Sequence, residues 1–340
     1  MPTIHNLAAA VLMFVAPALA PALAQPSLNP PSGAVGLSQV FGPGTAINSR
    51  NTPGDGNSRF KITQPGHYHL ASNIRVIDLP FLEQPIAIEI AASDVTIDLN
   101  GFTLSRGPLI SPGQTEPEDP VAGEDTVGIG VDDQDVRNIT IRNGTIYGFA
   151  TAVGLRRQAG GFSTVSARES ALADLRIRDA LRTGARAITI GTNADIERCV
   201  VRSQNSGISA GSGLVLRDSR IEADADGVLS ADALIESCRI ASGGNAIDAS
   251  DAIIRDSWIQ ANGAVIVTNQ AVIEGCRIQS DADINGPPAV RLGNGLIHGC
   301  TIISSATPID FQIEGAIADT VAIGGTSNIA SGVFVTGSKL

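Results

Sequence analysis

Short stretches of alternating hydrophobic and polar residues follow one another along most of this chain, each bounded by Gly, Asn, Asp or Ser. This pattern is typical of short strands and tight turns, and helical spacing is not sustained. A six-residue block recurs: an aliphatic residue, two polar or small residues, Cys or Ser, one variable residue, and Ile or Val. Its clearest copies begin at Ile196, Leu216, Ile235, Ile254, Ile273 and Ile297. The near-constant step indicates stacked repeats.

A further short apolar segment lies between successive blocks, so each repeat contains three strands. These segments are Gly207–Ala210, Gly227–Ser230, Ala246–Ala249, Ala264–Val267 and Ala289–Leu292. Weaker copies of the block begin at Ile97, Ile141 and Leu172, and their longer spacing implies inserted loops. We therefore predict an all-β, single-stranded right-handed parallel β-helix over residues 60–323, with about ten coils and three short strands per coil.

The first segment of the repeat region, Ile62–Leu70, followed by Val95–Leu104, resembles the opening of bacterial right-handed parallel β-helix repeat proteins of the pectin-lyase-like superfamily. The resemblance covers about residues 60–323. It implies the fold but leaves the function open, because the superfamily includes lyases, glycoside hydrolases, epimerases, phage tailspikes and adhesins.

The chain begins with an apolar run from Leu7 to Ala16, followed by Ala22-Leu23-Ala24. This pattern is typical of a secretory signal peptide with its cleavage site, so residues 1–24 are expected to be removed from a secreted or periplasmic protein. No other stretch approaches the roughly 18 apolar residues of a membrane span. We expect residues 25–59 to form an N-terminal extension and cap, and residues 324–340 a C-terminal cap or tail.

Acidic residues outnumber basic ones, with Asp+Glu 34 against Lys+Arg 23 and a net charge of -11. This balance argues against nucleic acid or an anionic membrane as a partner for the whole surface. A local basic stripe stays compatible with it.

The cysteines occupy the same position of the repeat, where they should point inward and stack between coils. Cys199 and Cys238 are separated by Ser219, which puts them about 9.6 Å apart and beyond the reach of a disulfide. Cys276 and Cys300 lie in adjacent coils. Their side chains should run parallel, which favours free thiols, and a bridge between them is the open alternative.

Two columns of outward residues flank the cysteine position. The first alternates in sign and is expected to be structural: Glu197, Arg217, Glu236, Arg255, Glu274 and His298. The second is basic and does not alternate; its candidate binding residues are Arg220, Arg239, Trp258 and Arg277. One interpretation is a solvated face in which Trp258 lies between two arginines that pair with acidic neighbours. The other is a platform for an anionic glycan, with guanidinium groups on uronate or sulfate and Trp258 stacked on a sugar.

The candidate catalytic residues are three carboxylates at turns of adjacent coils. Asp224, Asp226 and Asp248 faintly resemble the paired carboxylates of polygalacturonases, but no Gly-His-Gly or Arg-Ile-Lys follows them. Asp also favours tight turns for structural reasons. No dedicated metal site or cofactor is predicted, although Asp224/Asp226 and Asp281/Asp283 have the oxygen ligands that calcium prefers. A cleft is expected in the region of the inserted segments 115–126 and 156–170.

Two functions follow from these observations. The first is an exported protein that binds or processes an acidic, uronate-type polysaccharide; if it is an enzyme, it is a polysaccharide lyase or glycoside hydrolase. The alternative is a non-catalytic structural or adhesion solenoid of the cell surface or envelope. Because an open end of the solenoid exposes a strand edge, we expect a monomer or an end-to-end oligomer.

Overall fold

The fold is described from a computed structural model of the chain. It describes residues 44–77, 86–107, 126–131, 135–159, 163–178, 185–283, 286–324, 327–329 and 332–339. All of these belong to the unit Pro43–Leu340. The predicted signal peptide and most of the expected N-terminal extension lie outside the described residues. The described part of the chain contains no helix that is long and apolar enough to cross a membrane.

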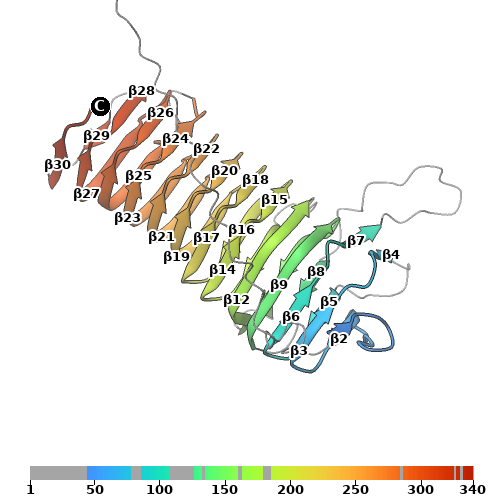
Figure 1. Cartoon of the computed structure of the whole chain (residues 1–340). Coiled ribbons are helices and arrows are strands. Elements are labelled where there is room, and N and C mark those ends of the chain that lie inside the picture. Colours follow the sequence, from blue (N-terminus) through green and yellow to red (C-terminus); the bar gives the residue numbers. More distant parts are fainter. Residues whose placement is uncertain are drawn as a thin grey trace, which may run out of the picture. The chain divides into compact units, whose positions relative to one another are not determined.

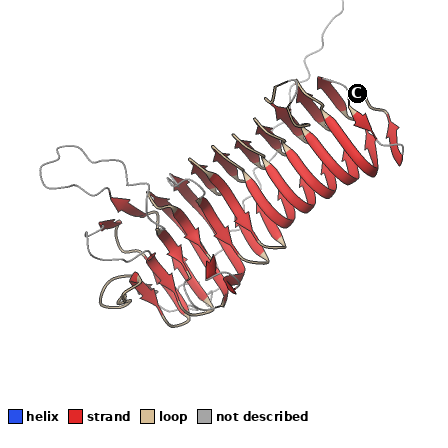
Figure 2. Ribbon diagram, turned by 180° about the vertical axis from the view of Figure 1, so that it is seen from behind, coloured by secondary structure: helices blue, strands red, loops and turns tan. Residues whose placement is uncertain are grey.

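The unit is a right-handed parallel β-solenoid of about 12 turns, close to the ten coils expected. Consecutive turns stack along one direction (Figure 1), and strands make up the regular structure of the described residues (Figure 2). The first sheet contains β2 (Ser58–Ile62), β5 (Ile86–Ile90), β8 (Val127–Gly130), β10 (Thr151–Gly154), β13 (Arg186–Ile190) and β16 (Ser206–Ala210), and ends at β29 (Asn328–Ile329). The second contains β1 (Thr45–Ala46), β3 (Gly66–His69), β6 (Val95–Asp98), β14 (Ala194–Glu197), β17 (Leu214–Arg217) and β30 (Gly332–Thr336). The third contains β4 (Ile74–Ile77), β7 (Thr103–Gly107), β15 (Val200–Ser203), β18 (Arg220–Ala223), β20 (Arg239–Ser242), β22 (Trp258–Ala261), β24 (Arg277–Ser280), β26 (Thr301–Ser304) and β28 (Val321–Gly324).

Seven longer strands cross from one sheet to the next. From the second to the third sheet run β9 (Val136–Tyr147) and β12 (Ser163–Arg178). From the first to the second run β19 (Val228–Glu236), β21 (Ile247–Arg255), β23 (Ile266–Glu274), β25 (Val290–His298) and β27 (Ile309–Ala318). The hairpin of β11 (Arg156–Ala159) with the start of β12 is antiparallel and lies within the inserted segment 156–170.

The register of the stacked strands follows the sequence repeat. Ile196 lies opposite Leu216, and Ile235, Ile254, Ile273 and Ile297 follow in successive coils. All of these side chains are fully or almost fully buried. The inward aliphatic columns therefore form one continuous core, which is what a parallel solenoid with one residue type per column provides.

A left-handed residue sits at the turn between the second and third sheets in coil after coil. Its φ lies between 48° and 62° at Arg198, Asp218, Ser237, Asp256 and Gly275. Asp and Gly tolerate this conformation better than other residues, which explains why they recur there. The turn aims the residue that follows it, Cys or Ser, back into the core.

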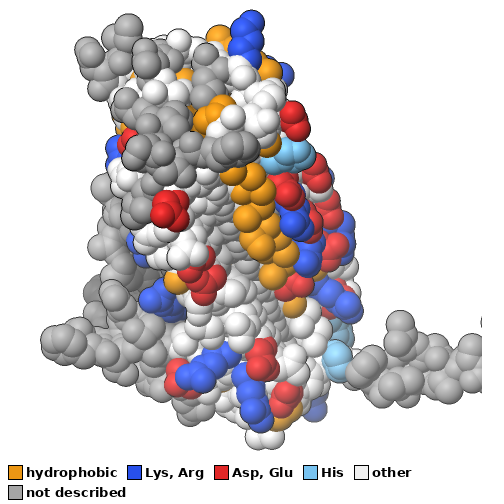
Figure 3. Space-filling view, turned by 90° about the vertical axis from the view of Figure 1, so that its left-hand side faces the viewer, with side chains coloured by type: hydrophobic (Ala, Val, Ile, Leu, Met, Phe, Trp, Pro, Cys, Tyr) orange, Lys and Arg blue, Asp and Glu red, His pale blue; other side chains and the backbone are white. Residues whose placement is uncertain are grey.

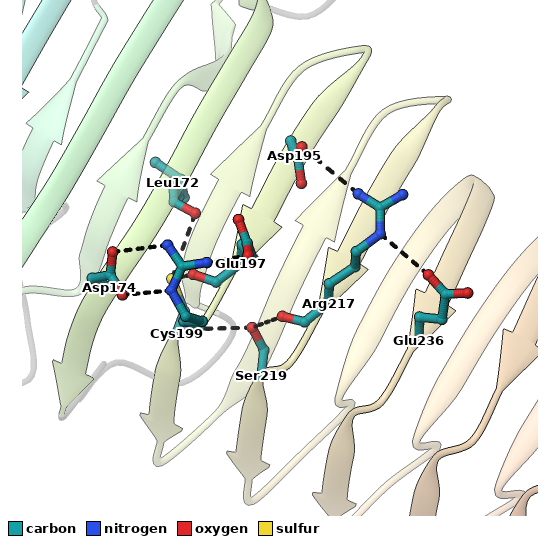
Figure 4. A network of polar contacts seen from close by, with 9 residues as sticks. Leu172, Asp174, Asp195, Glu197, Cys199, Arg217, Ser219 and Glu236 are labelled. Atoms are coloured by element: carbon teal, nitrogen blue, oxygen red, sulfur yellow. Dashed lines mark hydrogen bonds and ion pairs between the residues drawn. The ribbon is translucent and has the colours of Figure 1, made fainter. Parts of the chain in front are cut away.

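The inward Cys/Ser column satisfies buried backbone groups. The Ser219 hydroxyl donates to the Arg217 carbonyl at 2.7 Å and accepts the Cys199 backbone N–H at 3.1 Å (Figure 4). The Cys238 thiol donates in the same way to the Glu236 carbonyl at 3.1 Å. All four cysteines are free and buried. Cys276 and Cys300 thus join the column as thiols rather than as a disulfide.

The alternating outward column is confirmed as an in-register series on the second sheet. Arg217 pairs with Glu236 at 3.2 Å and approaches Asp195 at 3.9 Å, so that its charge bridges three coils (Figure 4). Arg255 pairs with Glu274 at 2.9 Å. Because both partners in each pair are partly exposed, we expect each pair to contribute less than about 1 kcal/mol.

Strands cover both ends of the described solenoid. β1, in the segment predicted as the N-terminal extension, pairs with β3 of the predicted solenoid. At the other end β30 pairs in parallel with β27 over Glu314–Ala318. The predicted C-terminal tail therefore contains a further strand of the second sheet.

Candidate functional site

The third sheet carries a basic face on a protein that is acidic as a whole. Between β12 and β26 its outward positions hold six arginines and a single carboxylate, that of Glu222. We call the six arginines the basic face: Arg176, Arg178, Arg202, Arg220, Arg239 and Arg277. Each is exposed or half-buried. The register that the sequence predicted for this column is correct, since Arg220, Arg239, Trp258 and Arg277 occupy four consecutive coils.

The arginines of the basic face divide into paired and open ones. Arg202 and Arg220 both contact Glu222, and this pair of guanidinium groups lowers the pKa of that carboxyl group against the opposing effect of its burial. Arg239 and Arg277 form no ion pair with any of the described acidic residues. None of Arg220, Arg239 and Arg277 pairs with a described residue of the alternating column, and the partner of Arg220 is Glu222 on the same sheet. Two guanidinium groups in the middle of the face stay available to an anion.

Trp258 lies between the two open arginines. The Arg239 guanidinium carbon is 4.3 Å from the centre of the Trp258 ring, a cation–π distance. Among the described residues, Arg277 makes no such contact with the ring, so the expected sandwich is formed on one side. The ring is half-buried and has one cation–π partner among the described residues.

A cleft of about 490 Å³ borders the basic face where its strands end. Glu222, Asp224, Gln260 and Asn262 contribute its polar lining. Asp224 therefore lies beside the basic face. Asp226 lies in the turn that leads to the first sheet, and Asp248 lies on the first sheet, at the start of β21. The structure brings the last two into electrostatic contact and leaves Asp224 on the rim of the cleft.

The carboxyl groups of Asp226 and Asp248 have different surroundings. Asp226 accepts the backbone N–H of Asn245 at 3.0 Å, which fixes it at the turn. Partial burial raises the pKa of Asp248, and the neighbouring charge of Asp226 raises it further. In glycoside hydrolysis the general acid is a carboxyl group whose pKa is raised, and a second carboxyl group acts beside it. The turn interpretation is supported by the hydrogen bond of Asp226, and the acid–base interpretation by the pKa of Asp248.

The predicted calcium ligands form no larger cluster. Within the described ranges, no group of three or more His, Cys, Asp or Glu side chains could hold a metal ion. Asp281 accepts hydrogen bonds from Gln279, at 2.9 Å, and from Gln260. Asp283 is exposed nearby. Calcium at either aspartate pair stays a prediction.

A second cleft, of about 640 Å³, lies where the inserted hairpin meets the first sheet. It is lined by the arginines Arg156 and Arg186 and by hydroxyl groups that include those of Thr189, Ser209 and Ser230. Thr189 donates to the Arg156 carbonyl at 3.1 Å and so ties the hairpin to the sheet. The inserted segment 156–170 indicated a cleft here, whereas the other inserted segment, 115–126, lies almost entirely outside the described residues. The contribution of Arg186 was missed, because it begins an ordinary strand and carries no local motif.

Comparison with known proteins yields similarity in structure and none in sequence. No family model and no curated protein matches the chain. The Dettilon tailspike protein is similar over 82% of this chain, with a TM-score of 0.53 and 12% identity, and this chain spans 60% of its length. A periplasmic alginate epimerase has a TM-score of 0.47 at 9% identity, and the match covers 89% of this chain and 82% of the epimerase chain. The A-module of an Azotobacter vinelandii mannuronan C-5 epimerase has a TM-score of 0.40 at 13% identity, and the match covers 81% of this chain and 90% of the module. The likeness to the tailspike protein, whose TM-score is above 0.5, supports a parallel β-helix as the fold.

Proposed function

We propose that this chain is an exported protein that binds an acidic, uronate-type polysaccharide along the basic face. The single observation that carries the proposal is the open pair Arg239 and Arg277 on either side of Trp258, in an array of arginines on a protein of net charge -11. A guanidinium fork binds a carboxylate through two parallel hydrogen bonds, and it gains most where no protein carboxylate competes.

The spacing of the face suits a polymer. Neighbouring coils are about 4.8 Å apart, close to the advance of one sugar ring along an extended 1,4-linked chain. A glycan lying across the strands would thus present one ring per coil. Arg239 and Arg277 are separated by the coil of Trp258, so two carboxylates would flank a ring stacked on the indole.

Binding is tested by retardation of the full chain in native gels that contain alginate or polygalacturonate, with a neutral glucan as the control polymer. We expect retardation by the acidic polymers that decreases with added salt. Arg239→Ala, Arg277→Ala and Trp258→Ala should each weaken retention roughly three- to tenfold, the loss of about 1 kcal/mol. Arg142→Ala is the matched control, because Arg142 is an exposed arginine of the second sheet that pairs with Asp98. Equal retention of all variants would remove the basic face as the site.

Processing of the polymer is a separate question, and the pKa of Asp248 favours it enough to test. Incubation with the same polymers is followed by absorbance of unsaturated products and by reducing ends. Hydrolysis that Asp248→Asn abolishes would support Asp248 as the general acid. Retention without either product would instead support the non-catalytic alternative, a surface or envelope solenoid that adheres to polysaccharide.

A further inference from the structure

An exposed apolar ladder runs down the second sheet, away from the basic face. It consists of outward side chains in register on five consecutive coils: Val215, Leu234, Ile253, Val272 and Leu296. Ile253, in the middle, is 39% exposed. The first four residues of the ladder line a shallow groove of about 540 Å³. The ladder forms a continuous hydrophobic strip beside the charged column (Figure 3).

Two polar columns border the ladder. On one side lies the alternating column, which near the ladder's centre reads Glu236, Arg255, Glu274 and His298. On the other side lies an edge column of Asp232, Asp251, Gln270 and Asn294, whose first three side chains are exposed. Contiguous apolar strips with polar rims are typical of protein contact surfaces.

We infer that the occupant of this ladder is a second copy of the chain, packed antiparallel about a two-fold axis. The axis lies in the plane of the interface and runs parallel to the strands of the second sheet. It passes between the coils of Ile253 and Val272. Such an axis reverses the order of the coils and keeps the columns in place. Each column therefore faces its own counterpart in reverse order, as an isologous contact requires.

All three columns are self-complementary in this one arrangement. Arg255 faces Glu274 of the other copy, and Glu236 faces His298. In the ladder Ile253 faces Val272 and Leu234 faces Leu296.

In the edge column Asp251 faces Gln270 and Asp232 faces Asn294, so that each carboxylate meets an amide. The carbonyl oxygen of Asn294 already accepts the Glu314 backbone N–H at 3.2 Å, and its NH₂ group is the donor for the carboxylate opposite.

Shifts of the axis lose this match. Moving it by half a coil places like charges opposite each other in the alternating column, which is destabilising. Moving it by a full coil toward the N-terminus brings Asp232 opposite Asp251. A full coil in the other direction brings Asp251 opposite Glu314, which follows Asn294 in the edge column. The charges thus select one register as well as one partner.

The contact is small. The five coils of the ladder and the next coil, in which Ala316 would face Val215, span about 29 Å. With a sheet roughly 15 Å wide, the contact covers on the order of 400 Å² per chain. Interfaces of this size are at the low end for specific complexes, so we expect a dimer that forms in the micromolar range. This inference does not depend on the proposed function, because the basic face belongs to another sheet.

Sedimentation velocity of the full chain from about 2 to 200 µM tests the association. We expect the sedimentation coefficient to rise with concentration, and Ile253→Asp to keep the chain monomeric across the range. Because Ile253 points outward, the variant should keep the circular dichroism of the parent, and its melting temperature should stay well above the temperature of the experiment. Arg239→Ala, on the third sheet, is the matched control and should associate like the parent. A monomer at every concentration, or a dimer that Ile253→Asp leaves intact, would overturn the inference.

Cross-linking tests the register. Two facing sheets lie about 10 Å apart. In the double variant Asp232→Cys/Asn294→Cys, a bifunctional maleimide of roughly that length should therefore link residue 232 of one copy to residue 294 of the other. Neither single variant should be cross-linked. In the proposed register, residue 232 of one copy and residue 232 of the other are offset by three coils, about 14 Å along the stack, and the same holds for residue 294. The four native cysteines are buried and should not react. Equal cross-linking of a single variant would contradict the antiparallel register.

Discussion

Ser219→Ala should destabilise the solenoid although it removes a single oxygen atom. Ser219 is 3% exposed, and its hydroxyl connects two coils by donating to the Arg217 carbonyl and accepting the Cys199 backbone N–H. Without it, a buried N–H loses its acceptor, which costs about 1–3 kcal/mol, and the hydrogen bond to the carbonyl, worth about 1 kcal/mol, is also lost. We expect a loss of about 2–3 kcal/mol in the free energy of unfolding.

Ser219→Cys keeps a side chain in the inward column but weakens the hydrogen bond from the Cys199 backbone N–H. A thiol in this column makes the same contact with the carbonyl two residues earlier, as Cys238 does. It is a weak acceptor for the N–H, so the expected loss is about 1 kcal/mol. Ser250→Ala, at an exposed serine, is the control and should change the stability by less than about 0.5 kcal/mol.

Urea unfolding measures these differences, followed by far-UV circular dichroism and by the fluorescence of Trp258, the chain's single tryptophan. Trp258 lies two coils from Ser219, so it reports on the affected region. Coincident transitions from the two probes would justify comparing the variants by a single free energy. If Ser219→Ala unfolds at the same urea concentration as Ser250→Ala, the inward column does not stabilise the stack through these hydrogen bonds.

Three further predictions concern the turn, a carboxyl group and the thiols. Ser237 has a φ of 54°, so Ser237→Gly should relieve strain and raise the stability by about 0.5–1 kcal/mol in the same urea assay. The pKa of Asp248 is raised above its ordinary value of 3.8, so the unfolded chain releases this proton first and the contribution of Asp248 to stability falls as the pH rises above about that value. Asp248→Asn should therefore be more stable than the parent at neutral pH and not at pH values well below 3.8, as measured by thermal melts across pH. All four cysteines are buried, and burial also raises the pKa of Cys199 and Cys238 to about 11, so a thiol reagent should label no cysteine in the native protein and all four in urea.

The register of the solenoid could be predicted because one residue per turn repeats with little variation. Ile196 and its equivalents stack on one another in successive coils, and the alternating charges fall in line with them. Where loops interrupt the period, prediction was weaker. The hairpin of β11 and β12 forms from an insertion whose strands have no counterpart in the other coils, so repetition could not reveal it.

The candidate site was harder to predict because it depends on side-chain partners. The sequence placed Arg220, Arg239 and Arg277 in one column, but not the contact of Arg220 with Glu222 that distinguishes it from the other two. Likewise, the proximity of Asp226 to Asp248 depends on how one turn stacks on the next coil. The exposed ladder was missed because its residues alternate with core residues along each strand. An outward Ile253 between inward residues looks like part of a buried strand.

The contrast between the two outward columns is itself an argument for a ligand. On the second sheet neighbouring coils carry opposite charges, which is how a parallel stack avoids repulsion. On the third sheet Arg220 and Arg239 are direct neighbours, and Glu222 pairs only with Arg220, so the like charges at this spacing are not fully compensated. The fold gains nothing from that repulsion, whereas a bound polyanion would remove it. A uronate polymer that binds only the folded chain should therefore raise its melting temperature, and by more for the parent than for Arg239→Ala.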